Sequence, residues 1–335
     1  MKKILFVLTL VLSTFVFAKE EVNVYTHRHY DTDKALFEKF EKETGIKVNV
    51  VKASADELIK RIELEGKRTP ADVLITVDAA RLHRAKSKDL LQPVVTETLI
   101  KNVPFHLRDK DAYWYGVTYR ARVIAYNPAK TDVNELSTYE DLANSKWRGK
   151  VLTRSSSNEY NQSLIASIIA HNGEEKASEW AKGIVGNFAR TPKGNDRDQA
   201  KAVLAGEGQL AIMNTYYMGK MYNSSNELER KVARTLKIFF PNQNDRGAHI
   251  NVSGIGVTKY AKNKDNAIKF IEFLTSEAAQ KDFAEANYEY PVNPNVEASE
   301  LVKSWGDFKA DTLNLSILGE LNETAVKIAD QAGWK

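Results

Sequence analysis

The sequence predicts an α/β protein of two lobes, each with a mixed, mainly parallel sheet flanked by helices and joined to the other by two crossover strands. Three observations lead to this prediction. Short β-prone runs alternate with amphipathic helical runs along most of the chain. The length of 335 residues is large for one hydrophobic core. Two longer β-prone runs are suited to cross between lobes.

The first part of the chain alternates regularly between the two kinds of element. Residues 22–26 alternate like a strand, and a helix is expected over 31–45, where glycine ends it. A strand over 46–51, a helix over 56–65 and an apolar strand over 72–76 follow. Strands separated by helices are typical of a parallel sheet that is covered on both faces.

The rest of the chain contains the two crossings. The expected elements are a crossing strand over 113–127, a strand over 150–153, a helix over 162–171, a strand over 210–213, a return crossing over 236–240 and 249–258, and helices over 265–274, 277–286 and in the carboxy-terminal segment. Two crossings imply that each lobe is built from separate segments. We place the N-terminal lobe at 19–118 plus 245–295 and the C-terminal lobe at 119–244 plus 296–335.

The N-terminus has the pattern of a secretory signal peptide. Lys2 and Lys3 precede the apolar run 4–17, and small residues at Val16 and Ala18 suit cleavage after Ala18. The apolar run is shorter than the ~20 residues that span a bilayer. The sequence therefore predicts a leader over 1–18 and an exported protein, which we expect in a Gram-negative periplasm.

Composition excludes several kinds of site. The chain has no cysteine, so disulfides, thiolate metal sites and a lipid-modified cysteine are excluded. The formal net charge is +4, and two of these charges, Lys2 and Lys3, belong to the predicted leader. This balance is not that of a nucleic-acid-binding protein.

Motifs for phosphate binding, dinucleotide binding, serine hydrolysis and zinc proteolysis do not occur. A secreted hydrolase would have to use acidic residues such as Asp31, Asp33 and Asp72, whose simpler roles are helix capping and strand-end turns. We therefore expect a binding protein and not an enzyme.

Tyrosines stand out by their positions. The chain has 14 of them, and three loci follow predicted strands and precede predicted helices: His29–Tyr30, Tyr160 and Tyr216–Tyr217. Open α/β sheets bind ligands beyond the carboxyl ends of their strands. Each locus alone is more simply explained by packing, but their recurrence at three similar junctions favours a common site.

Phenolate chemistry suits a hard trivalent cation such as Fe(III). Hard cations prefer oxygen ligands, and a bound cation drives off the phenol proton, which otherwise has a pKa of about 10. Four phenolates carry one negative charge more than Fe(III) neutralises. Arg120 or Arg122, in the first crossing, is placed to balance it, and we favour Arg120. An organic solute stacked on these rings is the alternative.

Several stretches resemble a known family. They are VYTHRHYDTD (24–33), PADVLITVDAARL (70–82), VIAYNPAK to WRGKV (123–151), MNTYYMGKM (213–221), SGIGVTKYAKN (253–263) and FLTSEAAQKDFAEANYEYPVNP (273–294). With them the chain resembles the periplasmic ferric-binding proteins of ABC-type iron importers, over essentially its whole mature length. The resemblance implies the type II periplasmic binding protein fold.

The resemblance also implies a ligand set. Carried over by position, the metal ligands fall on His29, Tyr30, Tyr160, Tyr216 and Tyr217. Tyr160 is typical of a tyrosine-rich branch, in which protein groups fill most of the iron shell. The family's other branch completes the shell with a bound anion, and a bound phosphate or carbonate stays open as an alternative for this chain.

One alternative ligand and one alternative function stay open. His27 is an alternative to His29, and a relative of the same fold for a small organic ligand or another metal is the alternative function. The expected partners are ferric iron and a permease in the inner membrane, with the receptor a monomer.

Overall fold

A computed structural model describes residues 20–28, 30 and 32–335 of the chain. Its strands form one mixed sheet in the order β2-β1-β3-β8-β4-β6-β5, with β7 and β9 also paired to β4. The strands are β1 (Glu21–Thr26), β2 (Lys47–Lys52), β3 (Val73–Thr76), β4 (Tyr115–Tyr126), β5 (Val151–Leu152), β6 (Leu210–Asn214), β7 (Lys237–Phe239), β8 (Ile250–Val257) and β9 (Tyr290–Pro291).

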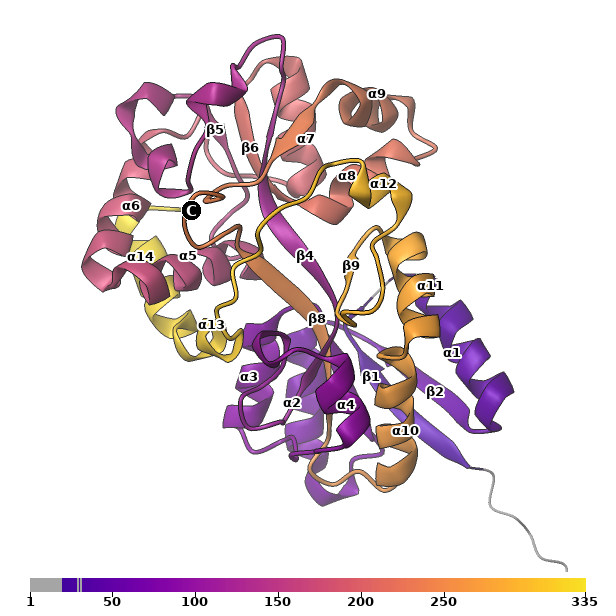
Figure 1. Ribbon diagram of the computed structural model, residues 1–335. Helices are drawn as coiled ribbons and strands as arrows, with labels where there is room; N and C mark the ends of the chain where they lie inside the picture. The colour runs from indigo at the N-terminus through magenta and orange to yellow at the C-terminus, as the bar shows by residue number, and fades with distance from the viewer. Residues whose placement is uncertain (1–19, 29, 31) are drawn as a thin grey trace, which may run out of the picture.

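Helices cover both faces of this sheet (Figure 1). They are α1 (Thr32–Thr44), α2 (Ala55–Glu65), α3 (Ala79–Ser87), α4 (Glu97–Asn102), α5 (Glu159–Asn172), α6 (Glu174–Gly186), α7 (Asp196–Ala205), α8 (Thr215–Tyr222), α9 (Glu227–Thr235), α10 (Lys264–Leu274), α11 (Glu277–Asn287), α12 (Glu300–Lys303), α13 (Ser316–Glu320) and α14 (Asn322–Ala332). The predicted α/β class is confirmed, and the predicted strands and helices lie within a few residues of the observed ones.

Antiparallel pairing is more extensive than expected. β1 pairs in parallel with β2 and β3, and β5 pairs in parallel with β6. The remaining pairings, which involve β4 or β8, are antiparallel. The reason is that the two crossing strands run back along each other, and strand direction in a crossing is not visible in hydrophobic pattern alone.

β4 joins two parts of the molecule. Its first half pairs with β8 and β9, and its second half pairs with β6 and β7. In Figure 1 one part gathers around β1 and β2 with α1–α4 and α10, and the other around β5 and β6 with α5–α9. This placement supports the expected crossings, while the assignment of 19–118 plus 245–295 and 119–244 plus 296–335 to two lobes stays a prediction.

Local sequence explains where the helices begin. Ser54 and Glu57 form a reciprocal capping box at the start of α2. Asn158 and Asn195 cap α5 and α7 through their side chains. These asparagines fix the first turns of the two helices.

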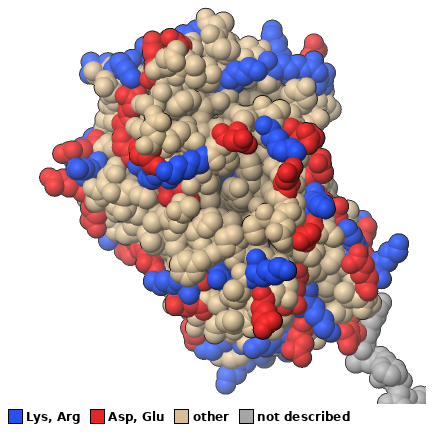
Figure 2. Space-filling view, viewed as in Figure 1, with Lys and Arg blue, Asp and Glu red and all other residues tan. Residues whose placement is uncertain are grey.

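In the residues that the structure describes, no helix is long and apolar enough to cross a membrane. The predicted leader, 1–18, lies outside those residues. On the face shown in Figure 2, basic and acidic side chains are interspersed around a broad uncharged area in the middle of the face, and they continue along its right-hand side.

Candidate metal site

Tyrosines from three separate junctions meet at one point. Tyr30 lies between β1 and α1, Tyr160 in the first turn of α5, and Tyr216 and Tyr217 in the first turn of α8. Strands β1 and β6 and the loop after β5 deliver them, as the strand-end rule predicts. The sequence therefore located the junctions, and the fold brings them together.

The contacts among the rings are direct. The hydroxyls of Tyr160 and Tyr216 lie 3.4 Å apart. The rings of Tyr216 and Tyr217 stack with centroids 4.2 Å apart. Tyr30 meets Tyr216 edge-on at 6.2 Å between centroids. Phenol rings from distant parts of the chain thus gather around a common centre.

Burial controls the protonation of these phenols. Tyr30, Tyr160 and Tyr216 are buried, and Tyr217 is half-buried. Burial raises the pKa of all four hydroxyls above the usual value of 10.0, because the charged phenolate loses its hydration. Without a cation at the centre, the four rings are neutral at physiological pH.

Arg120 is a buried cation next to Tyr160. Its guanidinium carbon lies 5.3 Å from the centroid of that ring. One terminal nitrogen donates to the carbonyl of Val77, and the other lies 3.5 Å from Ser253 Oγ. Its Nε has no hydrogen-bond partner among the described residues, and no carboxylate in that part of the chain lies within ion-pair distance of it. Its positive charge is therefore available to the phenols.

Arg122, the other arginine suggested by the sequence, has a different role. It forms a buried ion pair with Asp196 at 2.7 Å and donates to Asn161 Oδ1 at 2.8 Å. Asp196 begins α7 and also accepts from the backbone nitrogen of Asn214, the residue that precedes α8. Arg122 therefore ties together the first turns of α5, α7 and α8, and so positions three of the tyrosines.

Several cations that the sequence analysis did not single out line the site. The guanidinium carbon of Arg154 lies 5.5 Å from the ring centroid of Tyr160. Lys220 and Arg28 lie against Tyr30. Lys220 Nζ lies 3.6 Å from the ring centroid of Tyr30 and 5.3 Å from that of Tyr216. Burial lowers the pKa of Lys220 to about 8. The guanidinium carbon of Arg28 lies 4.6 Å from the Tyr30 centroid. The sequence contained a signal for each of them. Arg28 directly precedes His29–Tyr30, and Lys220 follows Tyr216 by one helical turn.

Arg28 is the centre of a buried charge network. It binds Asp33 with two nitrogens, at 2.8 and 3.1 Å, and reaches Glu289 at 3.3 Å. Glu289 also accepts from Thr118 Oγ1 at 2.9 Å. This network fixes the segment that carries Tyr30. Sequence analysis missed Glu289 because it follows α11, 261 positions from Arg28 along the chain.

The loop before Tyr160 is held by the end of the chain. Trp334 Nε1 donates to the carbonyl of Arg154 at 3.0 Å, and Ser156 Oγ donates to the carbonyl of Trp334. Trp334 is buried beside Trp180 and Phe188. The C-terminal segment therefore contributes to the position of the loop that leads into α5.

The remaining sequence-based candidates have structural roles or lie outside the described residues. Asp72 accepts from the backbone nitrogens of Asn23 and Asn263, each at 2.8 Å. Asp33 pairs with Arg28. His29 and Asp31 lie outside the described residues, so the predicted ligation by His29 stays a prediction.

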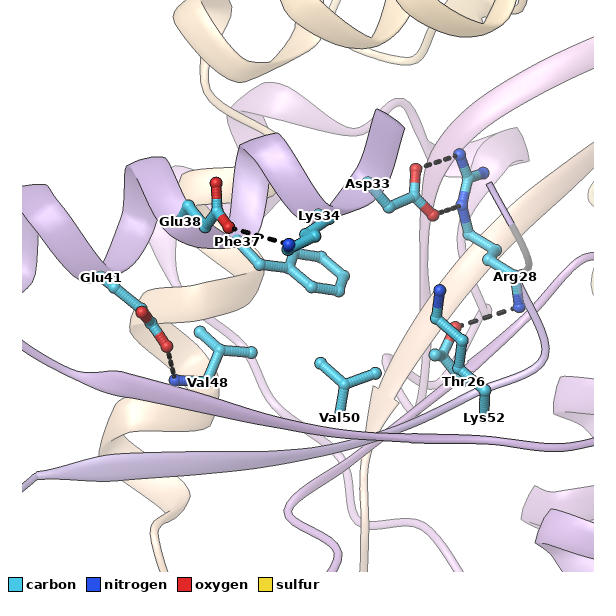
Figure 3. A pocket seen from close by; sticks show the side chains of 10 residues that line it. All are labelled: Thr26, Arg28, Asp33, Lys34, Phe37, Glu38, Glu41, Val48, Val50 and Lys52. Atoms are coloured by element: carbon cyan, nitrogen blue, oxygen red, sulfur yellow. Dashed lines mark hydrogen bonds and ion pairs between the residues drawn. The ribbon is translucent and has the colours of Figure 1, made fainter. Parts of the chain in front are cut away.

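Among the described residues no three His, Cys, Asp or Glu side chains form a group able to hold a metal ion. A groove of about 330 Å³ lies between α1 and β2, with Phe37, Val48 and Val50 on its walls (Figure 3). Arg28 and Asp33, which belong to the charge network beside Tyr30, also line it.

A mixed sheet with helices on both faces, and a site built where loops beyond its strands converge, is the architecture of a type II periplasmic binding protein. Solved structures confirm this class. The FutA (IdiA) protein of Trichodesmium, determined with iron and citrate ligands, is 51% identical with a TM-score of 0.92, covering 94% of this chain and 100% of that one. The ferric binding protein of Campylobacter jejuni is 48% identical with a TM-score of 0.89, covering 94% and 100%.

The chain belongs to the bacterial extracellular solute-binding protein family, whose sequence profile matches residues 68–309. Iron uptake protein A1 of Synechocystis is 53% identical over 95% of this chain and 88% of its own length. The resemblance drawn from the sequence stretches is thereby confirmed. The names of these three relatives all refer to iron.

Proposed function

We propose that this protein is a periplasmic receptor that captures ferric iron with tyrosinate oxygens and delivers it to an ABC-type permease. The observation that carries the proposal is the meeting of Tyr30, Tyr160, Tyr216 and Tyr217 around one point, with the Tyr160 and Tyr216 hydroxyls 3.4 Å apart. Oxygen donors of this kind suit a hard trivalent ion.

The four tyrosines are the proposed protein ligands, and His29 is the proposed fifth, with His27 as its alternative. Neutral phenols become ligands only by losing their protons, and the field of a trivalent ion supplies the driving force. Arg120 then balances the negative charge that four phenolates leave in excess. Counting only the four phenols and Arg120, the site carries +1 when it is empty and no net charge when it holds Fe(III).

Capture proceeds in two stages in this proposal. Tyr160, Tyr216 and Tyr217 lie on neighbouring helix starts held by Arg122, so they offer three oxygens at once. Tyr30 joins from the other part of the molecule when the two parts close, and water is excluded. Protonation of the phenols, or reduction of the iron, loosens the site at the permease. The receptor acts as a monomer and not as an enzyme.

Visible spectroscopy combined with metal analysis tests the proposal. Protein loaded from ferric citrate is expected to hold one iron and to show a broad visible band from phenolate-to-iron charge transfer. Iron that binds without this band would show that phenolates are not the ligands. Stabilisation by sugars or polyamines in a thermal-shift panel, without any by iron, would favour the organic-solute alternative.

A further inference from the structure

Helix α8 touches the turn after α11 at a position where only glycine fits. A methyl group on Gly219 would lie 2.5 Å from both Cβ and Cγ of Tyr288. Non-bonded carbon atoms attract one another best when they are about 3.5 Å or slightly more apart. Cβ is fixed to the backbone, so a change of side-chain rotamer at Tyr288 would not relieve the overlap. The backbone of α8 therefore lies so close to this turn that no residue larger than glycine fits at position 219.

Tyr288 has a backbone conformation that also favours glycine. Its φ of 58° and ψ of 30° lie in the left-handed region, which non-glycine residues adopt only when the surroundings impose it. Its two neighbours supply that constraint. Asn287 accepts from Thr32 Oγ1 at 2.6 Å, and Glu289 binds Arg28 at 3.3 Å.

These two anchors connect the turn to the segment that carries Tyr30. Arg28 precedes Tyr30 by two residues, and Thr32 follows it by two. Glu289 is also fixed to β4 through Thr118. A movement of Tyr288 would therefore shift the Tyr30 segment with it.

On the other side of the contact, Gly219 belongs to the helix that carries Tyr216 and Tyr217. It follows Tyr217 by two residues and immediately precedes Lys220, whose Nζ lies 3.6 Å from the Tyr30 ring. The contact thus joins the two chain segments that carry the two groups of tyrosines, and neither Gly219 nor Tyr288 is a proposed ligand.

We propose that the contact of Gly219 with Tyr288 is the stop that sets the spacing between Tyr216–Tyr217 and Tyr30 in the closed receptor. This inference rests on the proposed function. Gly219 and Tyr288 are positioning residues, since neither offers an oxygen to the metal from the contact itself. Any side chain at 219 separates α8 from the turn, and with it the two groups of phenol oxygens.

The size of the separation decides its effect. Restoring an ordinary carbon contact requires a shift of about 1 Å. Metal–ligand distances tolerate about 0.2 Å. A shift of this size leaves Tyr160, Tyr216 and Tyr217 together, because they are on the same side of the contact, and withdraws Tyr30.

Gly219→Ala tests the inference, with Gly186→Ala as the matched control. Gly186 also lies in a helix, the end of α6, but a methyl group there meets nothing within 4 Å. Alanine favours helix more than glycine does, so local propensity predicts no loss of stability in either variant. Gly219→Ala is expected to bind iron at least about tenfold more weakly and to release about one proton fewer per iron, while the metal-free protein still folds.

Removing the other side of the contact supplies the second test. Tyr288→Gly suits the left-handed backbone and makes room for a methyl group at 219. The double variant Gly219→Ala/Tyr288→Gly is expected to bind iron more tightly than Gly219→Ala alone and to regain the missing proton. If Gly219→Ala does not fold, this comparison is made between the double variant and Tyr288→Gly, which is expected to bind several-fold more weakly than the double variant.

The outcomes separate this inference from the proposed function. If the unaltered protein and Gly186→Ala bind no iron, the proposed function is wrong. If both bind iron and Gly219→Ala matches them in affinity and proton release, the stop is wrong and the proposed function stands. A double variant that binds no better than the weaker single variant also contradicts the stop.

Discussion

The two sides of the tyrosine cluster are built differently. Tyr160, Tyr216 and Tyr217 lie in the first turns of helices that are held together by Arg122 and Asp196. The guanidinium of Arg122 and the carboxylate of Asp196 lie 2.7 Å apart. Tyr30 sits on a segment between β1 and α1, fixed by the Arg28, Asp33 and Glu289 network. The three-tyrosine side is therefore assembled within one part of the molecule, whereas Tyr30 depends on how the other part approaches. The difference suggests capture on one side and completion from the other.

Loss of two ligands from the three-tyrosine side should have the largest effect. Tyr216→Phe with Tyr217→Phe removes two oxygens while keeping the rings, so iron affinity is expected to fall by more than about a thousandfold and the visible band to disappear. Titration against citrate and absorption spectra measure both. Tyr222→Phe, an exposed tyrosine of the same helix, is the control. An unchanged spectrum in the double variant would remove these residues from the ligand set.

Loss of Tyr30 should be less severe. Tyr30→Phe leaves three phenols in place, so iron is expected to bind about a hundredfold more weakly with the visible band retained but shifted. The exposed Tyr260→Phe is the control. If Tyr30→Phe abolishes the band while Tyr216→Phe alone does not, the order of capture proposed for the two sides is reversed.

Variants of the two arginines of β4 should distinguish the residue that balances charge, Arg120, from the residue that positions the tyrosines, Arg122. Arg120→Met is expected to weaken iron binding by about 10- to 100-fold with little change in unfolding temperature, because the guanidinium has no paired carboxylate. Arg122→Met leaves Asp196 buried without this partner, which is expected to cost about 3–5 kcal/mol of stability. Thermal unfolding and iron titration of both variants check the contrast. Equal stability losses in the two would contradict it.

Acidity should act more weakly on the Tyr30 variant than on the unaltered protein. Burial raises the pKa of all four phenols, so each is protonated between about pH 5 and pH 8 and releases its proton on becoming a ligand. Affinity therefore falls as pH falls, by about tenfold per unit for each proton released. Tyr30→Phe is expected to release one proton fewer on iron binding, so its affinity should depend less steeply on pH. Parallel slopes for the two proteins would show that Tyr30 does not ionise.

Much of the fold followed from sequence because its signals are local. Alternation and apolar runs indicated the strands, and the position of a residue after a strand was enough to select Tyr30, Tyr160 and Tyr216. Asn158 could be read as part of a polar loop before a helix, and it does cap α5. The spacing of tyrosines relative to strands is thus visible in the chain before any tertiary contact is known.

The rest depends on distant parts of the chain. Lys220 and Arg28 lie near predicted ligands in the sequence, but their contacts with the Tyr30 ring form only when α8 and the Tyr30 segment are brought together. Glu289 and Tyr288 belong to a turn that nothing in its local sequence connects to Tyr30. The antiparallel pairing of β3 with β8 likewise joins residues such as Thr76 and Gly254 that are far apart in the chain, and pattern reasoning carries no information on such partners.

Chain ends are commonly treated as expendable when a protein is trimmed or fused. Here the indole of Trp334 and its carbonyl hold the loop at Arg154 and Ser156, a few residues before Tyr160. Deleting that tryptophan, or attaching a rigid fusion directly behind it, is therefore expected to disturb the loop that leads to Tyr160, although Trp334 is not itself a proposed ligand. A C-terminal affinity tag on this receptor accordingly needs a flexible spacer. If a tagged preparation binds iron weakly, it should be compared with tag-free protein before the weak binding is attributed to a ligand residue.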